Sequence, residues 1–347
     1  MNDATGAGRM PRRIGLVYRL QKEPDWLTMT AEELVTFRDA ANRKAGSRLF
    51  RVVTGLPERG VTIRWEDVTL PDRVLPVRVY RPRRGGPGAL PLVLHVHGGG
   101  FVGTAAQCDW ANSHFAARLP AVVVSVEHRL LAPGIPLTAV VDDGWDVLRH
   151  LVRNAADHGI DPARVALAGE STGGLVSALV AVRAKAAALP VRAQVLVNPA
   201  ADVTETMLDY PSFEKYGDSP TLTVDKMRLF HRLAVPPGAD ARAVSPLYAD
   251  DLGALPPALV VVPTLDPIAD QGRRYAERLL ESGTPARLAE YPGAPHAFLA
   301  LPGLVPQAKP ARAEILAFLR EHLTGARPAA TVPGTASHHG DRSSTTP

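Results

Sequence analysis

Residues 165–174 of the chain read VALAGESTGG, an apolar run that ends in a glycine-flanked serine. The run has the length of a buried strand, and the residues that follow Gly174 form a helix-length apolar segment. The pattern therefore places G-x-S-x-G on a tight turn between a strand and a helix, the setting of a nucleophile elbow. A Cβ at Gly169 or Gly173 would collide with that turn or with a neighbouring strand. The stretch predicts that Ser171 is a nucleophile, held in a strained conformation with its hydroxyl exposed above the sheet.

A second glycine-rich loop follows another apolar strand further towards the N-terminus, where residues 92–103 read LVLHVHGGGFVG. A phosphate-binding loop would continue with Gly-Lys-Ser/Thr, and a dinucleotide site would require G-x-G-x-x-G at the start of a helix. Neither pattern is present. Backbone amides without side chains instead suit an oxyanion hole, whose donors must come within about 3 Å of a developing negative oxygen. We therefore interpret this glycine loop as an oxyanion hole.

A serine nucleophile requires a base, and the base requires a carboxylate that orients it. Asp266 and Asp270 follow the apolar run at 259–262, and His296 follows the run at 286–291. The chain order Ser171, Asp266, His296 is that of the α/β-hydrolases. Two simpler interpretations stay open: one of the two aspartates caps the next helix, and His296 is a surface loop residue.

The remaining strands and helices alternate along the chain and predict an α/β fold with about eight strands. Two alternating segments read as an antiparallel pair, and six nearly continuous apolar runs suit a parallel sheet that helices cover on both faces. The predicted strands are 61–71, 76–82, 92–96, 122–126, 165–168, 193–197, 259–262 and 286–291, and the predicted helices are 105–119, 139–154, 172–188, 269–282 and 309–323. Asp142 and Asp143 fall near the start of the second of these helices and suggest capping and buried hydrogen bonds.

Two segments do not follow this alternation, and we expect them to form a cap over one end of the sheet. Residues 1–50 contain a helical segment from Ala31, and the insertion at about 202–248 contains another at 224–234. The catalytic domain would then span 51–324. Residues 325–347 have almost no large apolar side chains and are expected to be a disordered tail. Five aromatic side chains suit either a pocket wall or the core of the cap, and the core interpretation is favoured for each: Trp26, Phe37, Tyr210, Phe213 and Phe230.

The composition excludes several classes of function. The chain of 347 residues has 39 Lys and Arg against 35 Asp and Glu, and its basic stretches are short and lack interleaved aromatics, which argues against nucleic-acid binding. The single cysteine, Cys108, excludes an internal disulfide and is expected to be an inert small hydrophobe. No sequence motif for a metal or cofactor is present, and none is expected. The absence of a signal-peptide pattern and of a long apolar run predicts a cytoplasmic protein with no membrane span, a monomer or a homodimer.

Taken together, these motifs resemble those of the hormone-sensitive-lipase-like branch of the α/β-hydrolase esterases, which includes bacterial and plant carboxylesterases. The resemblance covers roughly residues 61–323 and rests on the loop at 97–100, the elbow at Ser171, and the segments at 266–267 and 296–298. It extends to the stretches at 125–130, 142–145 and 245–247. It implies an α/β-hydrolase fold with a helical cap. It also implies that the amide of Thr172 joins Gly98, Gly99 and Gly100 in the oxyanion hole, and that His97 orders the glycine loop without transferring a proton.

The sequence differs from the family pattern at three places near the expected site. The usual Asp-Ser-Ala at the elbow is Glu170-Ser171-Thr172, in which the β-branched threonine narrows the site. The family's Tyr-Arg-Leu-Ala-Pro-Glu appears as HRLLAPG at residues 128–134, with one residue more and without the glutamate, which puts a supporting salt bridge in doubt. The usual glycine after the catalytic histidine is Ala297, which looks like a minor change.

The sequence therefore predicts a serine carboxylic-ester hydrolase that acts on small, short- to medium-chain acyl esters through an acyl-enzyme. An acyltransferase or a deacetylase of a specialised metabolite would use the same residues, so this alternative stays open. A non-catalytic small-molecule receptor is the third possibility. Plant hormone receptors of this fold lack the histidine, whereas His296 is present here.

Overall fold

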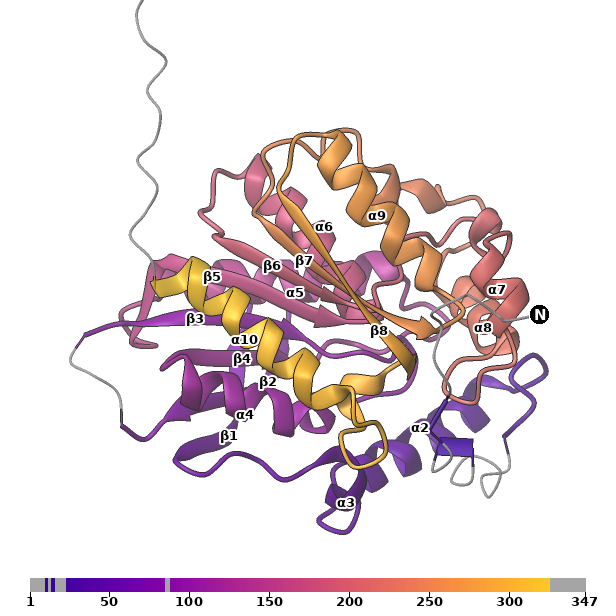
Figure 1. Ribbon diagram of the computed structural model, residues 1–347, viewed down its shortest axis with the longest axis horizontal. Helices are drawn as coiled ribbons and strands as arrows, with labels where there is room; N and C mark the ends of the chain where they lie inside the picture. Colours follow the sequence, from indigo (N-terminus) through magenta and orange to yellow (C-terminus); the bar gives the residue numbers. More distant parts are fainter. Residues whose placement is uncertain (1–9, 12–13, 16–22, 85–87, 325–347) are drawn as a thin grey trace, which may run out of the picture.

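The computed structural model describes residues 10–11, 14–15, 23–84 and 88–324. Its centre is a single eight-stranded sheet in the order β1-β2-β4-β3-β5-β6-β7-β8 (Figure 1). The strands are β1 (Val61–Thr69), β2 (Val74–Pro82), β3 (Leu90–Val96), β4 (Val122–Val126), β5 (Ile160–Glu170), β6 (Ala193–Val197), β7 (Ala258–Leu265) and β8 (Ala286–Pro295). β2 pairs antiparallel with β1 and β4, and every other pairing is parallel. The predicted α/β-hydrolase fold is confirmed.

Helices cover both faces of this sheet. The α-helices are α2 (Ala31–Ala45), α3 (Arg51–Thr54), α4 (Asp109–Arg118), α5 (Leu137–Arg153), α6 (Thr172–Ala186), α7 (Pro211–Tyr216), α8 (Val224–Ala234), α9 (Ala269–Glu281) and α10 (Ala308–Thr324). Short 3-10 helices are η1 (Ala105–Cys108), η2 (Glu205–Leu208), η3 (Ala241–Val244), η4 (Pro246–Tyr248) and η5 (Phe298–Ala300). α4 and α10 pack on one face around Val93 and Val123, whereas α5 and α6 pack on the other around Leu94 and Val124. Because both faces are covered, the central strands are buried along nearly their whole length, which explains their continuous apolar runs.

The observed elements differ from the predicted ones mainly at their ends. β5 begins at Ile160 and continues to Glu170, beyond the predicted 165–168 on both sides. The helix expected over 105–119 is divided into η1 and α4. These differences leave the order of elements unchanged.

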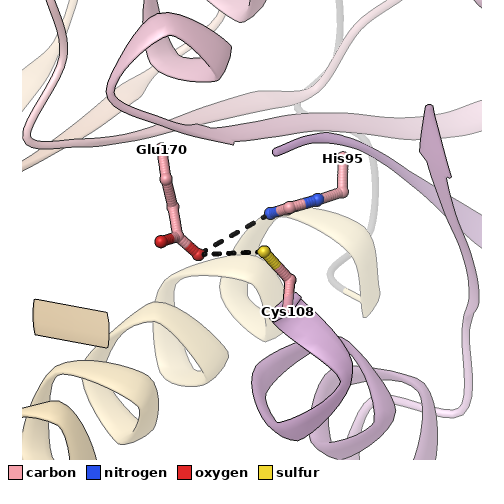
Figure 2. Close-up of side chains that lie close together, drawn as sticks. All are labelled: His95, Cys108 and Glu170. Atoms are coloured by element: carbon pink, nitrogen blue, oxygen red, sulfur yellow. Dashed lines mark hydrogen bonds and ion pairs between the residues drawn. The ribbon is translucent and has the colours of Figure 1, made fainter. Parts of the chain in front are cut away.

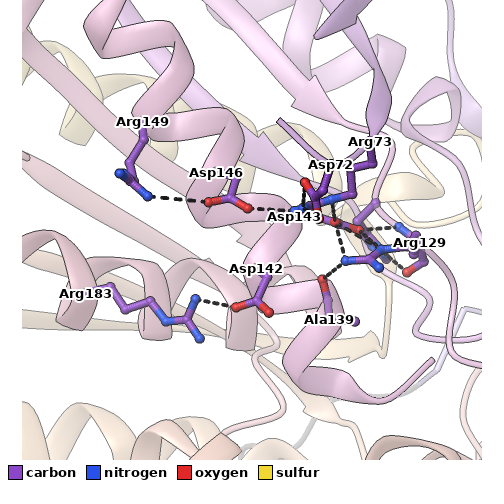
Figure 3. A network of polar contacts seen from close by, with 10 residues as sticks. Asp72, Arg73, Arg129, Ala139, Asp142, Asp143, Asp146, Arg149 and Arg183 are labelled. Carbon is purple, nitrogen blue, oxygen red and sulfur yellow. Dashed lines mark hydrogen bonds and ion pairs between the residues drawn. The ribbon is translucent and has the colours of Figure 1, made fainter. Parts of the chain in front are cut away.

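The position of Asp143 corrects an expectation. α5 begins at Leu137, so Asp143 lies inside the helix and does not cap it. The Asp143 carboxylate is fully buried and binds Arg73 Nε at 3.0 Å and Arg129 Nη2 at 2.8 Å, as Figure 3 shows. Asp143 Oδ2 also accepts a hydrogen bond from the backbone N–H of Arg129 at 2.9 Å. The carboxylate thus links α5 to the turn between β1 and β2 and to the segment after β4.

Helices α2, α7 and α8 lie together at one end of the sheet and form the helical cap (Figure 1). The N-terminal segment is joined to α8 by an ion pair between Glu23 Oε1 and Lys226 Nζ at 2.7 Å. The indole of Trp26 also packs on Phe101, just after the glycine loop, with ring centroids 5.6 Å apart. The boundaries 1–50, 51–324 and 202–248 stay predictions, and the predicted tail at 325–347 lies outside the described residues.

Within the part of the chain that the structure describes, no helix has both the length and the apolar character needed to span a bilayer.

Candidate active site

Ser171 stands on the sharp turn between β5 and α6, as its sequence context predicts. Its backbone has φ 53° and ψ −119°, a conformation that residues other than glycine rarely adopt. The turn is closed by close backbone contacts: a Cβ on Gly173 would lie 2.0 Å from the carbonyl oxygen of Val96, and one on Gly169 would lie 2.1 Å from that of Gly173. Glycine is therefore required at both positions to hold Ser171 at the end of its strand.

The structure brings Asp266 and His296 to the same serine. His296 Nε2 lies 2.9 Å from Ser171 Oγ, and His296 Nδ1 lies 2.8 Å from Asp266 Oδ2. Asp266 is fully buried, and His296 is 5% exposed. The second oxygen of Asp266 accepts a hydrogen bond from the backbone N–H of Ile268 at 3.0 Å, which fixes the carboxylate. Through these contacts Ser171 Oγ can transfer its proton to His296 Nε2. The Asp266 carboxylate then lies beside the imidazolium that forms.

The two simpler interpretations, an aspartate that caps the next helix and a surface position for His296, are wrong. Ile268 is the N-cap residue of α9, so neither Asp266 nor Asp270 caps that helix from the N-cap position. Asp270 instead lies in the first turn, accepts a hydrogen bond from Ser212 N at 2.8 Å and pairs with Arg273 at 2.6 Å. His296 is buried and is not a surface loop residue.

The glycine loop lies on the opposite side of Ser171 from β6. Gly98, Gly99 and Gly100 line a cavity of about 300 Å³ together with Ser171, Thr172 and His296. Gly99 has φ +96°, and a Cβ there would lie 1.7 Å from the carbonyl oxygen of Val102, so the loop requires glycine. Thr172 is the first residue of α6, and the first amides of a helix have no acceptor within the helix. The residues predicted to hold an oxyanion therefore line the same cavity as Ser171.

Two stacked histidines lie beneath the glycine loop. His97 Nδ1 is 2.9 Å from the carbonyl oxygen of Gly98, and the His97 ring stacks on the His128 ring with centroids 4.1 Å apart. Burial lowers the pKa of each ring to about 4, so both are neutral at pH 7. These contacts agree with a role for His97 in ordering the loop.

Glu127 is a supporting residue that the sequence did not reveal. Its carboxylate accepts hydrogen bonds from the backbone N–H of Ala105 at 2.7 Å and from Thr104 Oγ1 at 3.1 Å, just after the glycine loop. Burial raises the pKa of Glu127. The stretch at 125–130 resembles the family, but it does not reveal these contacts, because the partners of Glu127 lie more than 20 positions away along the chain.

A second buried cluster lies next to the nucleophile (Figure 2). Cys108 Sγ lies 3.7 Å from Glu170 Oε1, and His95 Nε2 lies 3.9 Å from the same oxygen. Spacing along the chain could not reveal this group, whose members come from β3, η1 and β5. It offers three ligand atoms within 4.8 Å of one another, whereas a structural zinc site holds four. Burial raises the pKa of the Cys108 thiol, which agrees with the expectation of an inert cysteine.

The cap supplies one wall of the cavity. Trp26, Met227 and Phe230 line it, although the core interpretation was favoured over the pocket for Trp26 and Phe230. They do both, since each is at most 5% exposed and belongs to the hydrophobic core. Asn42 on α2 adds a polar contact, because its Oδ1 accepts a hydrogen bond from the backbone N–H of Gly103 at 2.9 Å.

Comparison with known proteins agrees with this fold. The profile of the α/β-hydrolase fold family matches residues 93–300. The chain is 37% identical over 259 residues to the carboxylesterase NlhH of Mycobacterium tuberculosis, covering 72% of this chain and 79% of that protein. It is 32% identical over 255 residues to an ethyl acetate hydrolase of Pseudomonas putida, with the same two coverages.

A solved structure resembles the chain over most of its length. The ester hydrolase EH1AB1 from the metagenome of Lake Arreo superposes with a TM-score of 0.81 at 28% identity, covering 91% of this chain and all of that one. The chain belongs to the α/β-hydrolase family, within its hormone-sensitive-lipase-like branch of carboxylic-ester hydrolases.

Proposed function

We propose that the protein hydrolyses carboxylic esters by serine catalysis through an acyl-enzyme intermediate. The observation that carries this proposal is the continuous contact from Ser171 Oγ to His296 and from His296 to Asp266, at 2.9 and 2.8 Å. The carboxylesterase relatives support the reaction class.

In the first half of the reaction, His296 Nε2 accepts the proton of Ser171 Oγ while that oxygen attacks the ester carbonyl. Asp266 holds the imidazole with its Nδ1–H towards the carboxylate and stabilises the imidazolium. The amides of Gly98, Gly99, Gly100 and Thr172 donate to the tetrahedral oxyanion. His296 then protonates the departing alcohol.

In the second half, His296 removes a proton from water, which attacks the acyl-enzyme and releases the acid and Ser171. No cofactor or metal is required by these steps. The cavity of about 300 Å³, with an apolar wall of Trp26, Met227 and Phe230, supports short- to medium-chain acyl groups.

The test is hydrolysis of p-nitrophenyl acetate, butyrate and octanoate by the wild type and by Ser171→Ala, His296→Ala and Asp266→Asn. We expect each of the three variants to lose about 10⁴-fold or more in kcat, because the nucleophile, its base and the orienting carboxylate act as one unit. A fluorophosphonate should label the wild type and not Ser171→Ala.

Ser282→Ala is the matched control, because Ser282 ends α9 and does not line the cavity. Its rates and its labelling should equal those of the wild type. Turnover by Ser171→Ala at the wild-type rate would contradict the proposal.

A further inference from the structure

The turn that contains α3 exposes a group of large apolar side chains to solvent. Among the described residues, the three most exposed of these side chains are Leu49, Val52 and Leu56, at 85%, 78% and 71%. They lie close together in the sequence, and α3 lies at the periphery of the molecule (Figure 1). Single exposed leucines are ordinary on a protein surface, whereas a group of them marks an interaction site.

The backbone places the exposed side chains on one face of a helical turn. The N–H of Val52 donates to Leu49 O at 3.4 Å, and the N–H of Arg51 donates to Arg48 O at 3.4 Å, so the turn begins before α3 itself. Residues three positions apart on such a turn share a face. Leu49 and Val52 therefore form one outward row, and Arg48 and Arg51 form the row beside it. Thr54, on the inner side of the turn, is buried.

The inner side of this turn is fixed to the rest of the protein. The backbone N–H of Gly303 donates to Val53 O at 3.0 Å, and a Cβ on Gly303 would lie 1.9 Å from Val52 O. A Cβ on Gly55 would lie 2.5 Å from the ring of Trp110. Because the backbone is held this closely, the outward face keeps its place on the surface.

The charge along this stretch is entirely positive. Between Asp39 and Glu58 the chain has four cations and no acidic residue. None of these cations forms an ion pair with any residue that the structure describes: Arg43, Lys44, Arg48 and Arg51. Lys44 Nζ lies 5.4 Å from the centroid of the Phe50 ring, which brings the end of α2 next to the turn. The α3 patch is the surface formed by Lys44, Arg48, Leu49, Arg51 and Val52.

We propose that the α3 patch binds the protein to the surface of an anionic lipid bilayer. Exposed apolar side chains enter the boundary between headgroups and acyl chains, while neighbouring Lys and Arg side chains contact anionic headgroups. Leu49 and Val52 fill the first role. Lys44, Arg48 and Arg51 fill the second.

Other partners match only part of the α3 patch. A nucleic acid would pair with its cations but would leave Leu49 and Val52 in water. A second copy of this chain would place the same cations opposite one another in a two-fold interface. An anionic bilayer satisfies the apolar side chains and the cations together, so it is the partner that the patch fits.

The α3 patch also adjoins a wall of the cavity that contains Ser171. Ala41, Asn42 and Ala45 on the last turns of α2 line this cavity, and Lys44 belongs to the same part of the helix. A bound bilayer would therefore lie next to the α2 wall. The inference goes beyond the proposed function, and its test measures binding without hydrolysis.

The experiment is sedimentation of the full chain with vesicles. One set contains phosphatidylcholine alone, and the other contains equal parts of phosphatidylcholine and phosphatidylglycerol. We expect the wild type to bind the mixed vesicles at least about 10-fold more strongly than the neutral ones. The double variants Leu49→Ser with Val52→Ser and Arg48→Gln with Arg51→Gln should each lower the partition coefficient on mixed vesicles about 10-fold.

Two further double variants are matched controls on α9 and β8. Leu280→Ser with Leu288→Ser removes exposed apolar side chains elsewhere, and Arg274→Gln with Arg287→Gln removes the same charge elsewhere. Both should bind mixed vesicles as the wild type does, and circular dichroism shows whether each variant is folded.

Three outcomes would overturn the inference. The first is a wild type that does not sediment with mixed vesicles, and the second is equal binding by the wild type and both variants of the α3 patch. The third is a dimer, seen by size-exclusion chromatography, that Leu49→Ser with Val52→Ser dissociates while vesicle binding stays unchanged. That result would assign the patch to a second copy of the chain.

Discussion

At the scale of single residues, Ser171 and Ala297 both have a positive φ, which residues other than glycine rarely adopt. Ser171 has φ +53°, which the turn imposes and which exposes its hydroxyl. Ala297, directly after His296, has φ +58° and ψ 23°, a left-handed conformation. The family's usual glycine fits this conformation without strain, so the alanine is a larger change than the sequence suggested. A left-handed alanine costs roughly 1–2 kcal/mol.

We expect Ala297→Gly to increase the free energy of unfolding by about 0.5 kcal/mol. Relief of the left-handed strain exceeds the entropy that glycine adds to the unfolded chain, which is about 0.4–1 kcal/mol. Urea unfolding monitored by circular dichroism measures the change.

Ala294→Gly serves as the comparison, because Ala294 is fully buried inside β8 and does not have a positive φ. This variant should lose about 1 kcal/mol. A decrease in stability for both variants would show that Ala297 is not strained.

At the scale of elements, the cap and the sheet meet at the glycine loop. α2 contributes Asn42, whose Oδ1 accepts from Gly103 N at 2.9 Å, and the N-terminal segment contributes the Trp26 ring against Phe101. The loop that would donate to the oxyanion is therefore held from the cap side as well as by its own strand. A small displacement of such donors lowers the rate of reaction more than it lowers stability.

We expect Asn42→Ala to lower kcat for p-nitrophenyl butyrate about 3- to 10-fold, with a smaller effect on KM. The variant removes the acceptor of the Gly103 amide and loosens the glycine loop. Steady-state kinetics give both constants.

Asn42→Asp keeps an oxygen at the same place and should restore most of kcat. Equal losses in Asn42→Ala and Asn42→Asp would mean that this hydrogen bond does not position the loop.

The buried carboxylate of Asp143 joins α5 to the turn between β1 and β2 and to the segment after β4. We expect Asp143→Ala to lower the free energy of unfolding by about 3–5 kcal/mol, because Arg73, Arg129 and a backbone N–H lose their shared acceptor. Equilibrium unfolding in urea is the measurement.

The ion pair between Asp142 and Arg183 offers a matched control. Asp142 binds Arg183 at 2.7 Å, but both side chains are more than a third exposed. Asp142→Ala should therefore cost less than about 1 kcal/mol. Similar losses for the two alanine variants would contradict the role assigned to Asp143.

At the scale of the whole molecule, the buried histidine pair makes stability depend on pH. Burial holds the pKa of His97 and of His128 at about 4 in the folded protein, against about 6.5 in the unfolded chain. Between these values the unfolded chain binds protons that the folded protein does not. The contribution to stability is therefore complete above pH 6.5 and is lost as the pH falls towards 4.

We expect the free energy of unfolding to fall by about 2 kcal/mol for each of these two rings between pH 7 and pH 5. Burial also lowers the pKa of His114 and His158, which adds to the fall in the same direction. Comparison of the wild type with His128→Asn by urea unfolding at pH 7, 6 and 5 isolates the contribution of one ring. The variant should lose less stability over this interval, and parallel pH profiles would contradict the prediction.

The sequence by itself determined the fold and the residues that gather at the site. Ser171, the glycine loop, Asp266 and His296 each follow an apolar run within about five residues, and the carboxyl ends of neighbouring parallel strands meet at one edge of a sheet. The motifs and their positions after predicted strands therefore sufficed to predict that these residues meet. The sequence favoured Asp266 over Asp270 through the family resemblance at 266–267, since both aspartates follow the same strand.

Only the tertiary structure decided which atoms are partnered and which are not. Asn198 reads as an ordinary turn residue before a proline, and its unpaired amide becomes visible only when every neighbouring element is in place. Asn42, Glu127 and Asp143 likewise find partners far along the chain. Periodicity predicts helices and strands, and motifs predict the chemistry of a loop. Whether a buried polar atom finds a hydrogen-bond partner depends on distances between elements, which the local sequence does not encode.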